Sequence, residues 1–370
     1  MKSESLLSRV NEPYMRELEA AALRVIHSGL YLRGSETETM ERMMTEISGR
    51  KCCVGTASGL DALRLTVRAL IDSGRLRRGD EVITCAHTYI ASLLPLSEFG
   101  LTIKLVDAAP GRFAPSDTDW IAALGPDTKA AVVVHLYGIP AATNATIETM
   151  RKRGVIVIED CAQAIGAMSV DTSGELHPAG YSSDATAFSF YPTKNVGALG
   201  DAGAVTTDED DLARYIRILA NYGSDRRYHN IARGYNSRID ELQAAFITTK
   251  LPHIQSITDE RRATAEIYST HITHPEVDLP TEPDGTRAAW HQYVIRTPRR
   301  KELREYLNDH GIGTDIHYPT PAYRQPCYAG AFPTPMPEAD RLAEEVLSLP
   351  LAATSPAEAT RIAEIINSFH

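Results

Sequence analysis

The chain has 370 residues, of which 43% are hydrophobic and 23% charged, proportions typical of a globular protein large enough for more than one domain. Its 48 acidic and 38 basic residues give a formal net charge of -10, which argues against broad nucleic-acid binding, since such binding needs a basic footprint. No apolar run reaches the roughly 18 to 20 residues that cross a bilayer, and residues 1–15 lack the apolar core of a secretory signal. We therefore expect a cytoplasmic protein without a membrane segment.

The five cysteines are odd in number and lack the spacing of a metal site. We expect them to be reduced core residues, with neither a disulfide nor a bound metal. They are Cys52, Cys53, Cys85, Cys161 and Cys327.

The order of elements in the first part of the chain predicts strands that alternate with helices. Helical spacing of apolar residues covers 13–27, 36–47, 119–124 and 144–153, and another helix follows Ser58 and Gly59. Short apolar runs typical of strands lie at 52–55, 81–84, 103–106, 130–136, 155–158, 185–190 and 202–207. Such alternation predicts a largely parallel sheet covered by helices on both faces.

The turn formed by Ser58 and Gly59 begins a helix whose next residue is Leu60. Free backbone N–H groups and the positive end of the helix dipole make such a turn suitable for a phosphate. An ordinary N-cap explains the same residues and is favoured on the local pattern alone, because serine is a preferred cap.

The strand at 155–158 delivers Glu159 and Asp160 at its carboxyl end, the edge where ligands bind in open α/β sheets. Gln163 lies three positions beyond Asp160, where a helical turn brings both side chains to one side. A capping pair is the alternative interpretation.

Lys194 lies on a tight connector between the apolar runs 185–190 and 202–207. Apolar neighbours disfavour its charged form and make the amine nucleophilic. A solvated loop lysine is the usual alternative. Together with one of the acids that follow the strand at 155–158, however, Lys194 would supply the two groups that pyridoxal 5′-phosphate (PLP) requires, an imine-forming amine and an acidic partner for the ring nitrogen.

The remaining chain has a different pattern. Helices are predicted at 211–219, through Ile239–Phe246, at 259–271 and at 300–310, with a strand at 291–296. We expect a large PLP-binding α/β domain over 1–250 and a smaller α+β domain over 251–370.

Five segments in this order resemble the DegT-type sugar aminotransferases. They are VGTASGLDAL, GDEVITCAHTYIAS, VIEDCAQAIGA, FSFYPTKNVGALGDAG and GYNSRIDELQAA, and the resemblance runs from about Asn11 to Pro350. It implies the PLP-dependent transferase fold type I, with a mostly parallel seven-stranded sheet between helices.

The resemblance also implies roles for single residues. Lys194 would be the catalytic, imine-forming lysine, Asp160 would contact the pyridine nitrogen, and Gln163 would approach the ring hydroxyl. Tyr89 would stack on the pyridine face, since an aromatic residue occupies that place in the family.

The cofactor phosphate would lie at Ser58, Gly59, the backbone of Leu60, and Ser189. Family members commonly have threonine where this chain has Leu60, so no side-chain contribution is expected there. Asn236 would reach the phosphate of the neighbouring subunit, which implies a homodimer with active sites at its interface.

The substrates implied are L-glutamate and a nucleotide-linked keto sugar, contacted by Tyr191, His317 and Tyr318. The segment LGDAG, with Asp201, is more like relatives that act on 3-keto sugars. We therefore expect a dTDP-3-keto-6-deoxyhexose as substrate and a dTDP-3-amino-3,6-dideoxyhexose as product. A 4-keto or UDP-linked sugar and, in a different class, a non-catalytic regulatory protein of the same fold remain alternatives.

Overall fold

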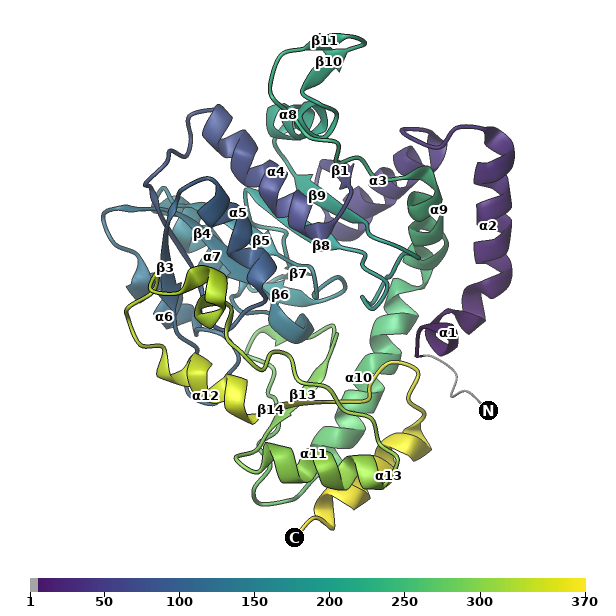
Figure 1. Cartoon of the computed structure of the whole chain (residues 1–370), viewed down its shortest axis with the longest axis vertical. Coiled ribbons are helices and arrows are strands. Elements are labelled where there is room, and N and C mark those ends of the chain that lie inside the picture. The colour runs from purple at the N-terminus through teal and green to yellow at the C-terminus, as the bar shows by residue number, and fades with distance from the viewer. Residues whose placement is uncertain (1–5) are drawn as a thin grey trace.

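The computed structural model describes residues 6–370, and its centre is a seven-stranded sheet of order β1-β9-β8-β5-β4-β2-β3 (Figure 1). Neighbouring strands are parallel except at β9, which is antiparallel to both β1 and β8. The mostly parallel α/β sheet predicted from the sequence is confirmed. The strands are β1 (Cys52–Thr56), β2 (Glu81–Cys85), β3 (Thr102–Val106), β4 (Thr128–Val134), β5 (Ile156–Asp160), β8 (Ala185–Ser189) and β9 (Gly203–Thr207).

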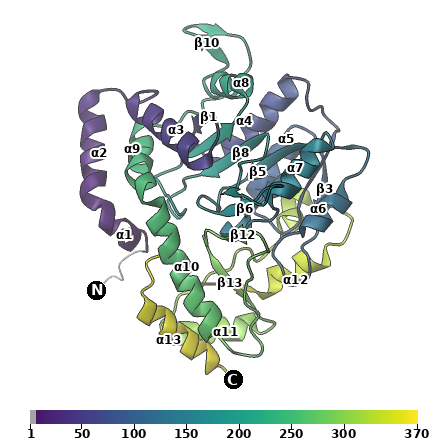
Figure 2. The same cartoon turned by 180° about the vertical axis from the view of Figure 1, so that it is seen from behind.

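Helices cover the sheet because successive strand residues face opposite layers. In β1, Val54 joins the core beneath α4 and α8, whereas Cys53 joins the core against α3 and α9. Helix α2 packs on the outside of α9, as both views show (Figures 1 and 2). The helices of this part are α1 (Leu6–Asn11), α2 (Met15–Ser28), α3 (Ser35–Ser48), α4 (Gly59–Asp72), α5 (Leu94–Glu98), α6 (Asp117–Ala123), α7 (Asn144–Lys152), α8 (Asp210–Ala220) and α9 (Glu241–Lys250).

The C-terminal part packs its helices around an antiparallel strand pair, β13 with β14. Sequence analysis predicted α10, β13 and α11 but did not identify α12, β14 or α13. Leu136 and Tyr137, which follow β4, belong to the same core, so the domain division at residue 250 stays a prediction. The elements are α10 (Ile254–His271), β13 (Tyr293–Arg296), α11 (Arg300–Asp309), α12 (Pro337–Glu345), β14 (Val346–Leu349) and α13 (Pro356–Asn367).

Two smaller sheets complete the described structure. One joins β6 (Met168–Val170), β7 (Leu176–Pro178) and β12 (Thr286–Arg287), and the other is the hairpin of β10 (Ser224–Arg226) and β11 (His229–Asn230). This hairpin projects from the body of the molecule (Figure 1).

The cysteines differ in one respect from the prediction. All five are free, and three of them are buried, but Cys52 is half-buried and Cys327 is exposed rather than in the core. Across residues 6–370, no helix combines the length and the apolar character needed to cross a membrane.

Candidate active site

The carboxyl edge of the sheet holds a buried acid at the end of β5. The side chain of Asp160, only 5% exposed, accepts hydrogen bonds from Ser92 Oγ to Oδ2 at 2.8 Å and from the Ala162 backbone N–H to Oδ1 at 3.1 Å. Burial raises the pKa of Asp160, while these two donors and the nearby Lys194 act in the opposite direction. The acid is therefore buried but has groups around it that favour its charged form.

Lys194 follows β8 in a turn closed by its own backbone N–H, which donates to the Tyr191 carbonyl at 2.8 Å. Burial lowers the pKa of Lys194 to about 8, and Asp160 partly opposes this shift. Its Nζ makes no hydrogen bond with any other residue of 6–370. The Lys194 side chain is thus half-buried, and near pH 8 a large fraction of its amine is neutral and free to react.

Two histidines lie in the same electrostatic environment. The pKa values of His291 and His317 are lowered, first by burial, and the charge of Lys194 lowers both further. His291 contacts Asn195 Oδ1 through Nδ1 at 3.3 Å, and His317 Nδ1 lies 2.8 Å from Ser348 Oγ. Both rings therefore favour the neutral state beside Lys194.

Gln163 is fixed in orientation by two partners. Its Oε1 accepts from the backbone N–H of Tyr137 at 2.6 Å, so its Nε2 is the donor to the Tyr318 hydroxyl at 3.2 Å. The Tyr318 and Tyr89 rings lie with their centroids 5.0 Å apart. Burial raises the pKa of Tyr318 to about 12, which keeps its hydroxyl protonated. The structure thus links three predicted residues from three different loops.

The start of α4 lies against the ends of β8 and β9. Ser58 is the N-cap, with Oγ accepting from the Asp61 backbone N–H at 3.1 Å. A Cβ at Gly59 would come within 2.6 Å of Ser189 Cβ, and a Cβ at Gly203 would collide with the Ser58 carbonyl. Only glycine allows this close approach, which brings the side chain of Ser189 against the first residues of α4.

The cap predicted for Ser58 is therefore present, and the same turn retains the features of an anion site. A serine hydroxyl can accept from the helix and still donate its own proton to a phosphate oxygen. Leu60, the second residue of α4, is half-buried and offers only its backbone N–H.

Two predicted residues have exposed side chains outside this network of buried groups. Tyr191 is 51% exposed, and Asn236 is also exposed, with Oδ1 accepting from the Arg238 guanidinium at 2.6 Å. Within residues 6–370, no contact joins Asn236 to Lys194 or Asp160.

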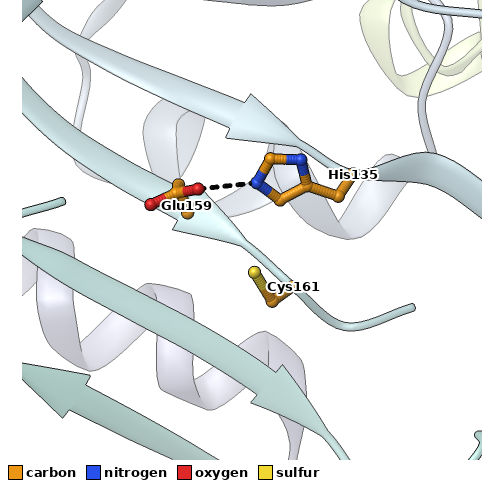
Figure 3. Close-up of side chains that lie close together, drawn as sticks. All are labelled: His135, Glu159 and Cys161. Atoms are coloured by element: carbon orange, nitrogen blue, oxygen red, sulfur yellow. Dashed lines mark hydrogen bonds and ion pairs between the residues drawn. The ribbon is translucent and has the colours of Figure 1, made fainter. Parts of the chain in front are cut away.

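A separate cluster of buried side chains includes the two chain neighbours of Asp160, Glu159 and Cys161. Figure 3 shows the ring of His135 and the carboxylate of Glu159 directed toward one another, and Nε2 and Oε1 are 2.8 Å apart. His135 Nδ1 accepts from the Ala141 backbone N–H at 2.9 Å, so the proton of the neutral ring is on Nε2. Cys161 Sγ is close to both side chains. Since both ring nitrogens have protein partners, His135 closes a hydrogen-bond network.

Sequence analysis missed Ser92, Tyr137 and His291. Ser92 stands three positions after Tyr89, in the segment that follows β2. Its closeness to Tyr89 in the sequence is the only feature that could have indicated a role in the site. Tyr137 adopts a positive φ of 61°. Its hydroxyl bonds His87 Nε2 at 2.8 Å and donates to the His317 carbonyl. No sequence pattern indicates such contacts between distant segments.

The fold is that of the PLP-dependent aminotransferases. A family model described as the DegT/DnrJ/EryC1/StrS aminotransferase family matches residues 14–367, and the chain belongs to this family. The chain is thus an aminotransferase, and the family depends on PLP.

Relatives of known name cover almost the whole chain. The dTDP-3-amino-3,6-dideoxy-alpha-D-galactopyranose transaminase of Aneurinibacillus thermoaerophilus is 40% identical over 98% of each chain. The UDP-N-acetyl-3-dehydro-alpha-D-glucosamine 3-aminotransferase of Acidithiobacillus ferrooxidans is 38% identical over 92% of this chain and 89% of its own. The crystal structure of S. venezuelae DesV with a ketimine intermediate superposes with a TM-score of 0.92, at 38% identity, over 98% of this chain and 96% of DesV.

Proposed function

We propose that this chain transfers the amino group of L-glutamate to a dTDP-3-keto-6-deoxyhexose, giving a dTDP-3-amino-3,6-dideoxyhexose. The observation that carries the proposal is the half-buried Lys194, its pKa lowered to about 8, beside the buried Asp160 at the carboxyl edge of the sheet. A nucleophilic amine and an acid in this relation are the two groups that PLP chemistry requires.

The residues present fit PLP. Ser58, Gly59 and Ser189 would hold the phosphate, because the absence of a Cβ at Gly59 and Gly203 brings Ser189 and Ser58 together at the start of α4. Asp160 would contact the pyridine nitrogen and Tyr89 the ring face. Gln163, whose Nε2 is the donor, suits the ring hydroxyl.

PLP, when bound, supplies an electron sink for the carbanion that forms at the reacting carbon. Lys194 takes the proton from that carbon and returns it elsewhere, acting as general acid–base, and a pKa of about 8 suits both roles near neutral pH. Asp160 holds a proton on the ring nitrogen only as a carboxylate. The donors Ser92 and Ala162 favour that form against the effect of burial.

The sugar would be contacted by Tyr191, which is in the same turn as Lys194, and by His317 and Tyr318. His317 is close enough to Lys194 for the lysine charge to lower its pKa. Asp201, in the segment LGDAG, supports a 3-keto substrate. The names of the two relatives above also place the amino group at C3, one on a dTDP sugar and the other on a UDP sugar. The UDP-linked 3-keto sugar is therefore the second candidate. Two substrates that use one site in turn predict ping-pong kinetics.

The active unit is proposed to be a homodimer. Asn236 is exposed and apart from the Lys194 cluster, which fits a role at the phosphate of a neighbouring subunit. Large apolar side chains are exposed on the loop between α2 and α3, namely Leu30, Tyr31 and Leu32. A second subunit would cover such surface.

The test is an absorbance spectrum of the PLP-loaded protein in three states. We expect a visible band that fades with L-glutamate and returns when dTDP-3-keto-6-deoxyhexose is added, and no such band in Lys194→Ala. Parallel additions of the UDP-linked 3-keto sugar and of a dTDP-4-keto sugar decide the substrate. Return of the band only with a 4-keto sugar would overturn the sugar assignment, and absence of any band would favour a non-catalytic protein.

A further inference from the structure

A cavity lies on the side of the Lys194 loop that faces α10. It has a volume of about 380 Å³ and is bounded by α1, α10 and the segment that precedes α13. Asn195, the residue after Lys194, lines its inner wall. Figure 1 shows α1 beside the first turns of α10, where this cavity lies. None of the proposed PLP or sugar contacts lines it.

A buried lysine forms part of the inner wall. Lys250, at the end of α9, is 3% exposed, and its Nζ donates to the Gly197 carbonyl at 2.6 Å and to Asn11 Oδ1 at 2.5 Å. No carboxylate within residues 6–370 pairs with it. Its third N–H remains for a ligand.

A buried arginine lines the same wall. Arg261, on α10, is 5% exposed, and one terminal nitrogen donates to the carbonyls of Trp290 and His291 at 3.2 and 3.1 Å. Its Nε and second terminal nitrogen have no hydrogen-bond partner among the residues described, 6–370, and neither is sealed from solvent. Arg261 lines the cavity, and these two nitrogens are its donors that remain for a ligand.

The charges around the cavity are unbalanced. Arg9 at the mouth adds a third cation, and Glu260 is the one carboxylate among the described residues that line the cavity. Glu260 is exposed and acts on Arg261 only at a distance, since burial still lowers the pKa of Arg261 to about 10. Buried cations without an acid partner are costly, and a bound anion would offset that cost.

We propose that this cavity binds a small oxyanion, a phosphate or carboxylate group, between Arg261 and Lys250. A guanidinium offers paired N–H donors that match two oxygens of such a group. The same Lys250 holds the Gly197 carbonyl, and Asn195 follows Lys194 directly. An anion bound here would therefore stabilise the loop that carries Lys194 from the side that faces α10. This effect would not depend on which sugar is transferred.

The test is calorimetric titration of the PLP-loaded protein with sodium sulfate and, separately, with sodium succinate, at ionic strength held constant with sodium chloride. Two lining residues, Arg9 and Glu260, are both charged and exposed, so their charges can be changed without disturbing the buried pair. We expect Glu260→Gln to lower the Kd about three- to tenfold and Arg9→Gln to raise it by a similar factor, as expected for one charge close to a partly buried anion.

Matched controls are available nearby in the chain. Glu266→Gln, on α10, and Arg16→Gln, on α2, change the same charges at exposed positions outside the cavity lining and should leave the Kd unchanged. Binding of sulfate alone would indicate a phosphate-type ligand, and binding of succinate alone a carboxylate. Equal Kd values for Glu260→Gln and Glu266→Gln, or no binding of either anion at about 10 mM, would overturn the proposal.

Discussion

Ser92 Oγ donates a hydrogen bond of 2.8 Å to Oδ2 of Asp160, and both side chains are buried. Thr88 Oγ1 lies 2.9 Å from the same Ser92 oxygen, so the segment after β2 supports the acid at the end of β5. Since burial alone raises the pKa of Asp160, Ser92 is one of the groups that keep this carboxyl charged. It is a positioning residue for the proposed chemistry.

Replacement of Ser92 by alanine should weaken the enzyme most at low pH. Without this donor the pKa of Asp160 rises further, so the carboxylate is lost at a higher pH as the solution is acidified. A hydrogen bond to a charged group is worth about 1.5–3 kcal/mol, which corresponds to a loss in kcat/KM of about ten- to a hundredfold. The measurement is the pH profile of kcat/KM.

The control for this change is Ser97→Ala, five positions along the chain, where the exposed hydroxyl contacts Tyr328 instead. It should leave the acid limb of the profile in place. An unshifted acid limb in Ser92→Ala would show that Ser92 does not act through Asp160.

Uptake of PLP by the cofactor-free protein should become faster with rising pH and level off above about 8. The neutral amine of Lys194 is the reactive form, and burial lowers its pKa to about that value. Asp160→Asn should move this rise to lower pH, because Asp160 is the group that raises the pKa of Lys194. The rate is followed as the appearance of the visible band.

Asp127→Asn, at an exposed turn, is the matched control and should not shift the rise. A rise centred near 10.5, the ordinary value for lysine, would contradict the burial of Lys194.

A side chain at Gly59 should damage the proposed phosphate site. The Cβ of Gly59→Ala would come within 2.6 Å of Ser189 Cβ, and relief of such a contact costs about 1–3 kcal/mol. We expect a lower Tm and a Kd for PLP raised by about tenfold or more. Gly125→Ala, whose Cβ would meet only Thr128 Oγ1 at 3.8 Å, should change neither. An unaltered Kd for PLP in Gly59→Ala would remove this turn from the phosphate site.

The large sheet was predictable because its strands are short apolar runs separated by helices and turns. The pattern at 155–158 and its acid, Asp160, shows this directly, since β5 covers Ile156–Asp160. Strand β14 is also fully buried, but it follows α12 without a turn signal and its partner β13 is distant in sequence. Periodicity alone does not reveal such a pairing.

The candidate site was predictable only where a residue type carries its own chemistry. Lys194 and Asp160 are of this kind, and their proximity is reflected in the mutual effect on their pKa values. Ser92 acts through a contact between segments far apart in the chain. Likewise, the amide orientation of Gln163 depends on a backbone N–H of Tyr137. These relationships exist only after folding.

The proposed contribution of Asn236 to the active site of the neighbouring subunit can be tested by mixing two inactive variants. Lys194→Ala lacks the catalytic amine, and Asn236→Ala should lose most activity through weaker phosphate binding. In a mixed dimer, one site would combine the intact Lys194 of one subunit with the intact Asn236 of the other. Random pairing at equal amounts makes half of the dimers mixed, so about a quarter of all sites should be active.

Co-expression of Lys194→Ala with Asp160→Asn is the matched control. Both residues belong to the same chain's loops, so no pairing of these variants creates an intact site, and activity should stay at the level of the separate variants. Recovery in the first mixture without recovery in the second, measured as turnover per PLP bound, identifies Asn236 as a residue donated across the interface. If neither mixture regains activity, Asn236 acts within its own chain, and the shared site is wrong.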